Sequence, residues 1–133
     1  MKNILLIGGS YGIGLAIAKE IQFENNIYIA SRSNENLVDV KATYIPFDAT
    51  TDTIDTSLLP TIIDGLVYCP GSINLRPFKG IKPEAFETDL QINFISLVKV
   101  IQSVLPNLLA SEQASIVTFS SVAASMGMPF HTS

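Results

Sequence analysis

Tryptophan is absent from the 133 residues, and cysteine and histidine occur only once each, as Cys69 and His131. A single cysteine cannot form an intramolecular disulfide, and it cannot build a cysteine-rich zinc site. No cluster of His, Cys or acidic residues has the spacing of metal ligands. We therefore expect no metal centre, and the low cysteine content favours a reducing, cytoplasmic location.

Basic residues are also few, with eight Lys and Arg against twelve Asp and Glu and a net charge of −4. This balance argues against nucleic acid or an anionic membrane as a partner. Lys99, Gln102 and Ser103 interrupt the best candidate for an apolar run of about eighteen residues. Met1-Lys2 does not open a secretory signal. The hydrophobic fraction of 47% therefore indicates a soluble, densely packed single domain, residues 1–133.

Short apolar segments alternate with helical patterns along the chain. The apolar segments lack polar alternation, as expected of parallel strands covered on both faces, and comprise residues 3–7, 27–30, 43–47, 65–69 and 115–120. Ile13, Ile17 and Ile21 recur every four residues, on one apolar helical face, and predict a helix between the first two strands. Pro83 suits the first turn of another helix. This alternation predicts an α/β fold, a doubly wound parallel sheet with right-handed crossovers.

A long helical pattern precedes the last predicted strand. Its apolar positions, predicted to share one face, are Leu97, Ile101, Val104, Leu105 and Leu108. Pro106 is a candidate kink in this helix. Segments 33–40 and 52–62 have weaker patterns, which we interpret as a short helix and an irregular one.

Four glycines surround the turn between the first strand and its helix, in the sequence GGSYGIG at residues 8–14. Gly8 would let the chain turn, Gly12 would let backbone approach a pyrophosphate, and Gly14 would let the helix pack closely. The helix amino terminus would offer N–H groups and a positive dipole end to phosphate. A turn that merely requires glycine is the alternative. The position between a strand and an amphipathic helix favours phosphate binding.

The spacing G-x-x-x-G-x-G resembles that of the short-chain dehydrogenase/reductase family. Further segments fall in the family's order: IASRS (29–33), FDAT (47–50), LVYCPG (66–71), DLQINFISL (89–97) and SIVTFSSVAASMGMP (115–129). The resemblance implies a Rossmann fold with five strands in the order 3-2-1-4-5, truncated after strand five. It also implies an oxidoreductase that interconverts a small-molecule alcohol and a ketone by hydride transfer.

The resemblance also assigns cofactor-binding roles. It places Gly8, Gly12, Ile13 and Gly14 at the pyrophosphate, Ser10 and Tyr11 near the adenosine phosphate or ribose, Asp48 and Ala49 at the adenine, and Pro70 and Gly71 beside the cofactor. Asp48 could instead be an ordinary loop acid. The family usually has Asn-Asn-Ala-Gly at 68–71, where this chain has Tyr-Cys-Pro-Gly. Only the glycine is kept, and Pro70 removes one N–H from the turn.

Ser31 and Arg32 indicate the choice of cofactor. An NAD enzyme of this family has an acid at the end of strand two, which binds the ribose hydroxyls and repels a 2′-phosphate. Ser31 stands there instead, followed by Arg32, whose planar guanidinium suits a phosphate. We therefore predict NADP rather than NAD. A solvated loop arginine is the alternative, and Tyr11 is not the basic residue that the family often adds to the glycine loop.

The resemblance implies that Ser121 polarises a substrate carbonyl, with Ser120 as the less favoured choice, and that Asn93 supports a proton relay. A helical Asn93 bonded to backbone is the alternative. The family's catalytic tyrosine and lysine would fall at positions 134 and 138, whereas the chain ends at Ser133. His131 has no carboxylate partner in its motif and is not expected to act as an acid or base.

The tyrosines at 11, 28, 44 and 68 are never followed four places later by lysine, so none of them replaces the missing catalytic tyrosine. We therefore expect the chain to represent a cofactor-binding half that is inactive alone. The alternative is a non-catalytic NAD(P)-binding sensor or regulatory module. An apolar face on helix 97–109 would also lead to self-association.

Overall fold

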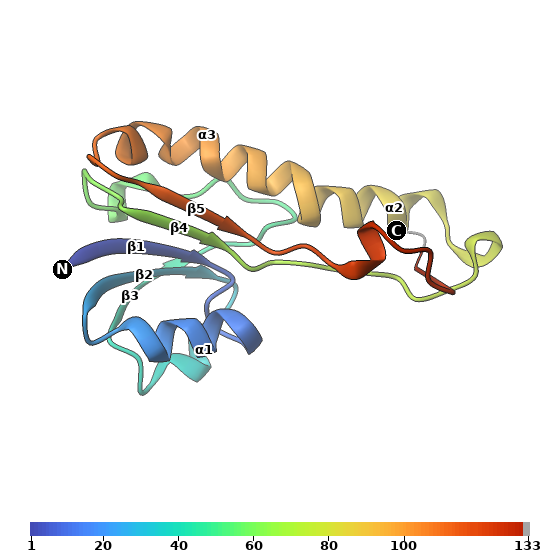
Figure 1. The fold of residues 1–133 in the computed structure, drawn as a ribbon, viewed down its shortest axis with the longest axis horizontal. Coiled ribbons are helices and arrows are strands. Elements are labelled where there is room, and N and C mark those ends of the chain that lie inside the picture. Colours follow the sequence, from blue (N-terminus) through green and yellow to red (C-terminus); the bar gives the residue numbers. More distant parts are fainter. Residues whose placement is uncertain (132–133) are drawn as a thin grey trace.

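Five parallel strands form one sheet in the order β3-β2-β1-β4-β5 in the computed structural model, which describes residues 1–131 (Figure 1). The strands are β1 (Lys2–Ile7), β2 (Asn25–Ser31), β3 (Ala42–Pro46), β4 (Gly65–Tyr68) and β5 (Ser115–Thr118). Each coincides with a predicted strand, and every end lies within two residues of the predicted one. The predicted α/β fold and strand order are confirmed.

Helices cover the two faces of the sheet (Figure 1). Helix α1 (Gly12–Ile21) lies on one face. On the other face, α2 (Pro83–Leu90), the π-helical segment η4 (Gln91–Ile95) and α3 (Ser96–Leu109) form one continuous helix. The weak patterns at 33–40 and 52–62 each contain only one 3-10 turn, η1 (Glu35–Leu37) and η2 (Thr56–Leu58). Two more 3-10 turns are η3 (Phe78–Gly80) and η5 (Val122–Ala124).

The strands send alternate side chains into two separate hydrophobic cores. Leu5 and Ile7 of β1 join the core beneath α3, whereas Leu6 joins the core beneath α1. All three side chains are fully buried. This two-sided burial explains why β1 reads as a continuous apolar run, and it anchors the glycine-rich turn that follows Ile7.

The buried face of α1 differs from the predicted one. Gly14 and Ala18 are its buried residues, whereas Ile13 is 62% exposed. Ile17 and Ile21 are half-buried and pack against the core. Ile13 was wrongly placed on the packing face because the helix approaches the sheet through its smallest residues.

Helix α3 also packs through a slightly different stripe. Val100, Val104 and Leu108 are buried against the sheet, but Leu105 is 43% exposed. The helix continues past Pro106 to Leu109, since a proline in the last turn removes only one helical hydrogen bond. The exposed Leu105 and Leu109 are compatible with the predicted self-association, which stays a prediction.

The prediction that every strand is covered on both faces is wrong for β5. All four of its residues are exposed, and Ile116 and Val117 are each 46% exposed. β5 stands at the end of the sheet and pairs only with β4 among the described residues, and none of its side chains joins either hydrophobic core.

The continuous helix Pro83–Leu109, 27 residues long, is long and apolar enough to cross a membrane by length and composition alone. This helix differs from the expectation from the sequence, in which Lys99, Gln102 and Ser103 interrupt the apolar run. A core helix of a soluble protein passes the same test. Val100 and Val104 of this helix lie in the hydrophobic core, whereas only 22% of the apolar window is buried.

Candidate functional site

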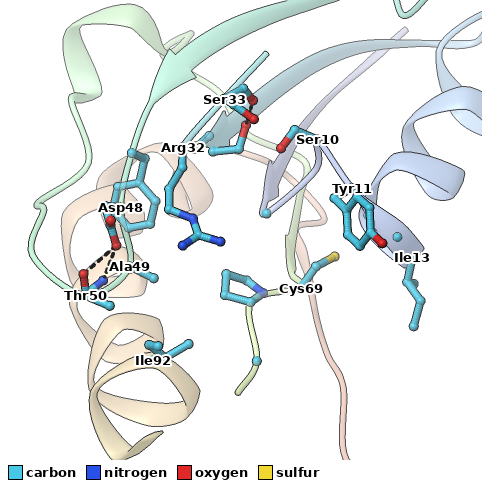
Figure 2. A pocket seen from close by; sticks show the side chains of 18 of the residues that line it. Ser10, Tyr11, Ile13, Arg32, Ser33, Asp48, Ala49, Thr50, Cys69 and Ile92 are labelled. Carbon is cyan, nitrogen blue, oxygen red and sulfur yellow. Dashed lines mark hydrogen bonds between the residues drawn. The ribbon is translucent and has the colours of Figure 1, made fainter. Parts of the chain in front are cut away.

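The carboxyl ends of β1, β2, β3 and β4 surround one cavity of about 530 Å³ (Figure 2). This volume lies within the range of roughly 300–1,000 Å³ that small-molecule sites usually have. Its lining comprises Gly8, Ser10, Tyr11, Gly12, Ile13, Gly14, Ala30, Ser31, Arg32, Ser33, Asn36, Phe47, Asp48, Ala49, Thr50, Cys69, Pro70, Gly71 and Ile92.

All twelve residues predicted to bind the cofactor lie in this lining, whereas Ser121 and Asn93 do not. Seven further lining residues were not predicted from the sequence: Ala30, Ser33, Asn36, Phe47, Thr50, Cys69 and Ile92. Five of these are immediate chain neighbours of predicted residues. Ile92 is also a neighbour of a predicted residue, Asn93, and the π-helical segment brings it to the cavity. No sequence signal pointed to Asn36, which η1 brings to the cavity.

The glycine-rich turn has a backbone that only glycine adopts easily. Gly8 and Gly12 have φ angles of +75° and +54°. A Cβ at Gly8 would lie 3.2 Å from Pro70 Cδ, so this turn also packs against the β4 loop. A Cβ at Gly12 would meet nothing within 4 Å, so its φ angle and not a close protein neighbour explains this glycine.

Helix α1 begins directly at the turn. A Cβ at Gly14 would lie 2.4 Å from the Gly8 carbonyl oxygen, which shows how closely the helix packs on the turn. The N-cap residue Tyr11 provides no side-chain hydrogen bond to the first helical turn. Unpaired N–H groups and the positive end of the helix dipole therefore remain for an anion, and a diphosphate has the required charge.

The β2 loop presents the only basic side chain in the described cavity lining, Arg32. Arg32 is exposed, and its guanidinium points into the cavity in Figure 2. The loop is ordered by hydrogen bonds on both sides of Arg32. The buried Ser31 hydroxyl donates to the Ser33 carbonyl at 2.9 Å, and Tyr44 donates to the Ser31 carbonyl at 3.0 Å. The Asn36 amide donates to the Ser10 carbonyl at 3.2 Å and so joins this loop to the glycine turn.

Asp48 closes the turn after β3. Its Oδ1 accepts hydrogen bonds from the Thr50 hydroxyl at 2.6 Å and the Thr50 N–H at 2.8 Å (Figure 2). These two bonds lower the pKa of Asp48, and the charge of Arg32 lowers it further. Asp48 thus has the turn-forming role expected of a loop acid. It also remains an ionised acceptor in the cavity lining.

A hydrogen bond joins the end of β4 to the π-helical segment. The Tyr68 hydroxyl donates to the Ile92 carbonyl, and the burial of this side chain raises the pKa of Tyr68. π-Helical turns have irregular backbone bonding and recur at functional sites. Burial also raises the pKa of Cys69 to about 11, so its thiol is protonated at neutral pH. Tyr68 and Cys69, which stand where the family usually has two asparagines, therefore pack at the end of β4, and Tyr68 also bonds to the π-helical segment.

The two predicted catalytic residues are engaged elsewhere. Asn93 Oδ1 accepts from the Ser72 N–H, and Asn93 Nδ2 donates to the Ser72 carbonyl, both at 2.8 Å. Asn93 is therefore bonded to backbone, as in the alternative interpretation, and the backbone is that of Ser72 in the loop after β4. Ser121 is exposed and accepts from the Ala123 N–H at 3.2 Å as the cap of η5, and Ser120 is also exposed. The catalytic roles of Asn93 and Ser121 stay predictions.

Two further predictions concern His131 and metals. The His131 ring Nδ1 lies 2.9 Å from the Pro129 carbonyl oxygen, and the residue forms an isolated bridge with Leu75. Within residues 1–131, no group of three or more His, Cys, Asp or Glu side chains is arranged to hold a metal ion.

Two curated proteins show sequence similarity. The PIGF/3-ketodihydrosphingosine reductase fusion protein of Schizosaccharomyces pombe is 30% identical over 116 residues, which cover 74% of this chain and 24% of that protein. The fatty acyl-CoA reductase of Acinetobacter baylyi is 27% identical over 139 aligned positions, which cover 91% of this chain and 47% of that protein. The matched residues thus span 24% and 47% of the length of these two relatives.

Solved structures share the fold. A short-chain dehydrogenase/reductase of Saccharomyces cerevisiae superimposes with a TM-score of 0.85 at 25% identity, over 99% of this chain and 58% of the other. A short-chain dehydrogenase of Shigella flexneri complexed with NADP gives 0.86 at 22% identity, over 98% and 63%. The family model of the short-chain dehydrogenases matches residues 2–133. The chain therefore belongs to the short-chain dehydrogenase family of oxidoreductases.

Proposed function

We propose that this chain binds NADP(H) in the cavity at the carboxyl ends of the strands. It would form the cofactor-binding part of an oxidoreductase that interconverts an alcohol and a ketone. The observation that carries the proposal is the combination of the glycine turn, the uncapped α1 terminus and the Arg32 guanidinium around one cavity.

The position of Arg32 favours NADP over NAD. Arg32 follows the buried Ser31, which occupies the position at which an acid would repel a 2′-phosphate. The hydrogen bonds of Ser31 and Asn36 order the loop that carries Arg32. A charge-assisted hydrogen bond contributes about 1.5–3 kcal/mol, which corresponds to a preference on the order of ten- to a hundredfold. The Shigella flexneri relative in complex with NADP agrees with this choice.

The substrate would be a carbonyl compound or the corresponding alcohol. The names of the two curated relatives refer to a ketone and to a fatty acyl thioester. When bound, the cofactor supplies the hydride acceptor or donor. The chain's own residues would bind and orient it: the α1 terminus holds the diphosphate, Arg32 the 2′-phosphate and the Asp48 turn the adenine.

Titration of the chain with NADPH and NADH tests the proposal. Wild-type protein should bind NADPH at least about tenfold more tightly than NADH. Arg32→Ala should remove most of this difference and leave NADH binding unchanged. Arg76→Ala, which changes the other arginine of the chain at an exposed position outside the cavity lining, is the control and should bind both ligands like the wild type. A parallel loss of both cofactors in Arg32→Ala would remove its role in phosphate recognition.

A second candidate is a nucleotide-binding module without catalysis. The observation that favours it is that neither Asn93 nor Ser121 lines the cavity, while both have partners elsewhere. Both candidates predict NADPH binding without turnover by the 133-residue chain. Measurable alcohol or ketone turnover by this chain would contradict the assignment of its catalytic groups.

A further inference from the structure

Asp89 is a buried carboxylate outside the cavity lining. It lies on α2 and is only 4% exposed. A buried carboxylate is strongly unfavourable unless hydrogen bonds compensate its lost hydration. Asp89 Oδ1 accepts from the Ser72 hydroxyl at 2.6 Å, and Asp89 Oδ2 accepts from the Asn74 amide at 2.8 Å. Within residues 1–131, Ser72 and Asn74 both belong to the loop that follows β4, so these two bonds join the carboxylate to that loop.

Asn93 lies one helical turn after Asp89 and holds the same loop. Its side-chain amide makes the two 2.8 Å hydrogen bonds with the backbone of Ser72 described above. The two helix residues together therefore fix Ser72 through its hydroxyl, its N–H and its carbonyl group. These bonds hold the beginning of a loop whose residues 73–81 are mostly exposed.

The restrained loop begins at the cavity wall. Pro70 and Gly71 line the cavity and immediately precede Ser72. Pro70 has no N–H with which to fix its own position. The position of Pro70 is instead fixed by hydrogen bonds of residues on either side of it in the chain. The Cys69 N–H donates to the Ile7 carbonyl, and the Ser72 N–H donates to Asn93 Oδ1. Pro70 also packs on Gly8, so a shift of this loop would reach the glycine turn.

The sheet order separates this wall from the Arg32 side. β4 and β2 flank β1 on opposite sides, with β3 beyond β2. The β2 and β3 loops carry Arg32 and Asp48, whereas the β4 loop carries Pro70 and Gly71. A dinucleotide that places its adenosine at the β2 and β3 loops must therefore extend its other nucleoside along the β4 loop.

We propose that Asp89 is a positioning residue for the cofactor: it holds the 70–74 loop so that Pro70 and Gly71 form the wall against the nicotinamide nucleoside. This inference rests on the proposed NADP(H) site. It assigns Asp89 no contact with the cofactor. It predicts that the loss of Asp89 weakens only the nicotinamide half of the bound cofactor.

Two ligands separate this role from general stabilisation. NADPH occupies both halves of the site, whereas adenosine 2′,5′-bisphosphate occupies only the adenosine half. Removal of Asp89 by Asp89→Ala should weaken NADPH binding by about tenfold and change bisphosphate binding by less than about twofold. The fluorescence of bound reduced nicotinamide should also move toward that of free NADPH. Asp89→Asn, which keeps one oxygen acceptor, should restore part of the NADPH affinity.

Glu87→Ala is the matched control, because Glu87 is an exposed acid on the same helix. It should bind both ligands like the wild type. Ser72→Ala and Asn74→Ala remove the partners from the loop side, and they should weaken NADPH selectively even if Asp89→Ala fails to fold.

Equal weakening of both ligands in the folded variants would overturn the inference, and so would unchanged NADPH binding. Failure of the proposed function has a different signature. In that case the wild-type protein binds neither NADPH nor the bisphosphate, and the inference falls with it.

Discussion

Replacing Gly14 with alanine tests the geometry of the glycine turn most severely. An alanine Cβ at this position would lie 2.4 Å from the Gly8 carbonyl oxygen and 3.0 Å from Gly9 Cα. Both neighbours are backbone atoms, so no side-chain rotation can relieve the overlap. Either the amino-terminal turn of α1 moves away from the sheet, or the glycine turn moves toward the cavity.

The energetic cost follows from two opposing effects. Overpacking of this kind costs typically about 1–3 kcal/mol. Alanine regains up to about 1 kcal/mol because it favours the helix more than glycine does. We therefore expect Gly14→Ala to lower the free energy of unfolding by about 1–2 kcal/mol and the Tm by roughly 4–8 °C.

Cofactor binding should be more sensitive than stability. The displaced turn carries the groups proposed to hold the diphosphate, and each 1.4 kcal/mol of lost binding free energy is about a tenfold loss of affinity. Thermal unfolding and NADPH titration of the same sample provide the assay. Gly80→Ala is the control, since a Cβ there meets nothing within 4 Å and its φ angle is ordinary. A Gly14→Ala protein with wild-type Tm and wild-type NADPH affinity would refute the close packing described here.

Two further substitutions test the contacts that support the site and the sheet. Tyr68→Phe leaves the Ile92 carbonyl without its hydroxyl donor, and thermal unfolding should show a loss of about 1–2 kcal/mol; no loss would mean that the bond contributes nothing. Asp64 accepts from the Asn3 N–H and the Ser111 hydroxyl, and these bonds lower the pKa of Asp64 below its ordinary 3.8. The resulting stabilisation is present above that ordinary value and is lost as the pH falls through the lowered pKa. The Tm difference between wild type and Asp64→Asn should therefore be largest near neutral pH and shrink below about pH 4, and a pH-independent difference would contradict this assignment.

The sequence predicted those parts of the fold that depend on local pattern. β1 appears as the apolar run 3–7 because both of its faces are buried, and Pro83 marks the start of α2 because proline suits a first helical turn. The strand order followed from the resemblance to a family. The residues around the cavity followed from the same source, because a parallel sheet brings the ends of its strands to one edge.

Other features depend on packing that the pattern does not contain. The four-residue spacing of the isoleucines in α1 predicted that Ile13 is buried. The helix instead packs closely on the glycine turn at Gly14, so Gly14 and Ala18 face the sheet and Ile13 is exposed. The apolar composition of β5 suggested burial, but burial depends on which elements cover a strand, and the side chains of β5 join neither hydrophobic core. The sequence pattern assigned Asp89 no contact, because its hydrogen bonds join it to residues 15 and 17 positions away.

A crystal structure of the chain with NADP at saturating concentration tests the central claim most directly. The account predicts that the diphosphate lies at the amino terminus of α1 against the glycine turn. It also predicts that the 2′-phosphate lies within hydrogen-bond distance of the Arg32 guanidinium. A cofactor bound elsewhere, or a cavity without it at saturation, would contradict the account.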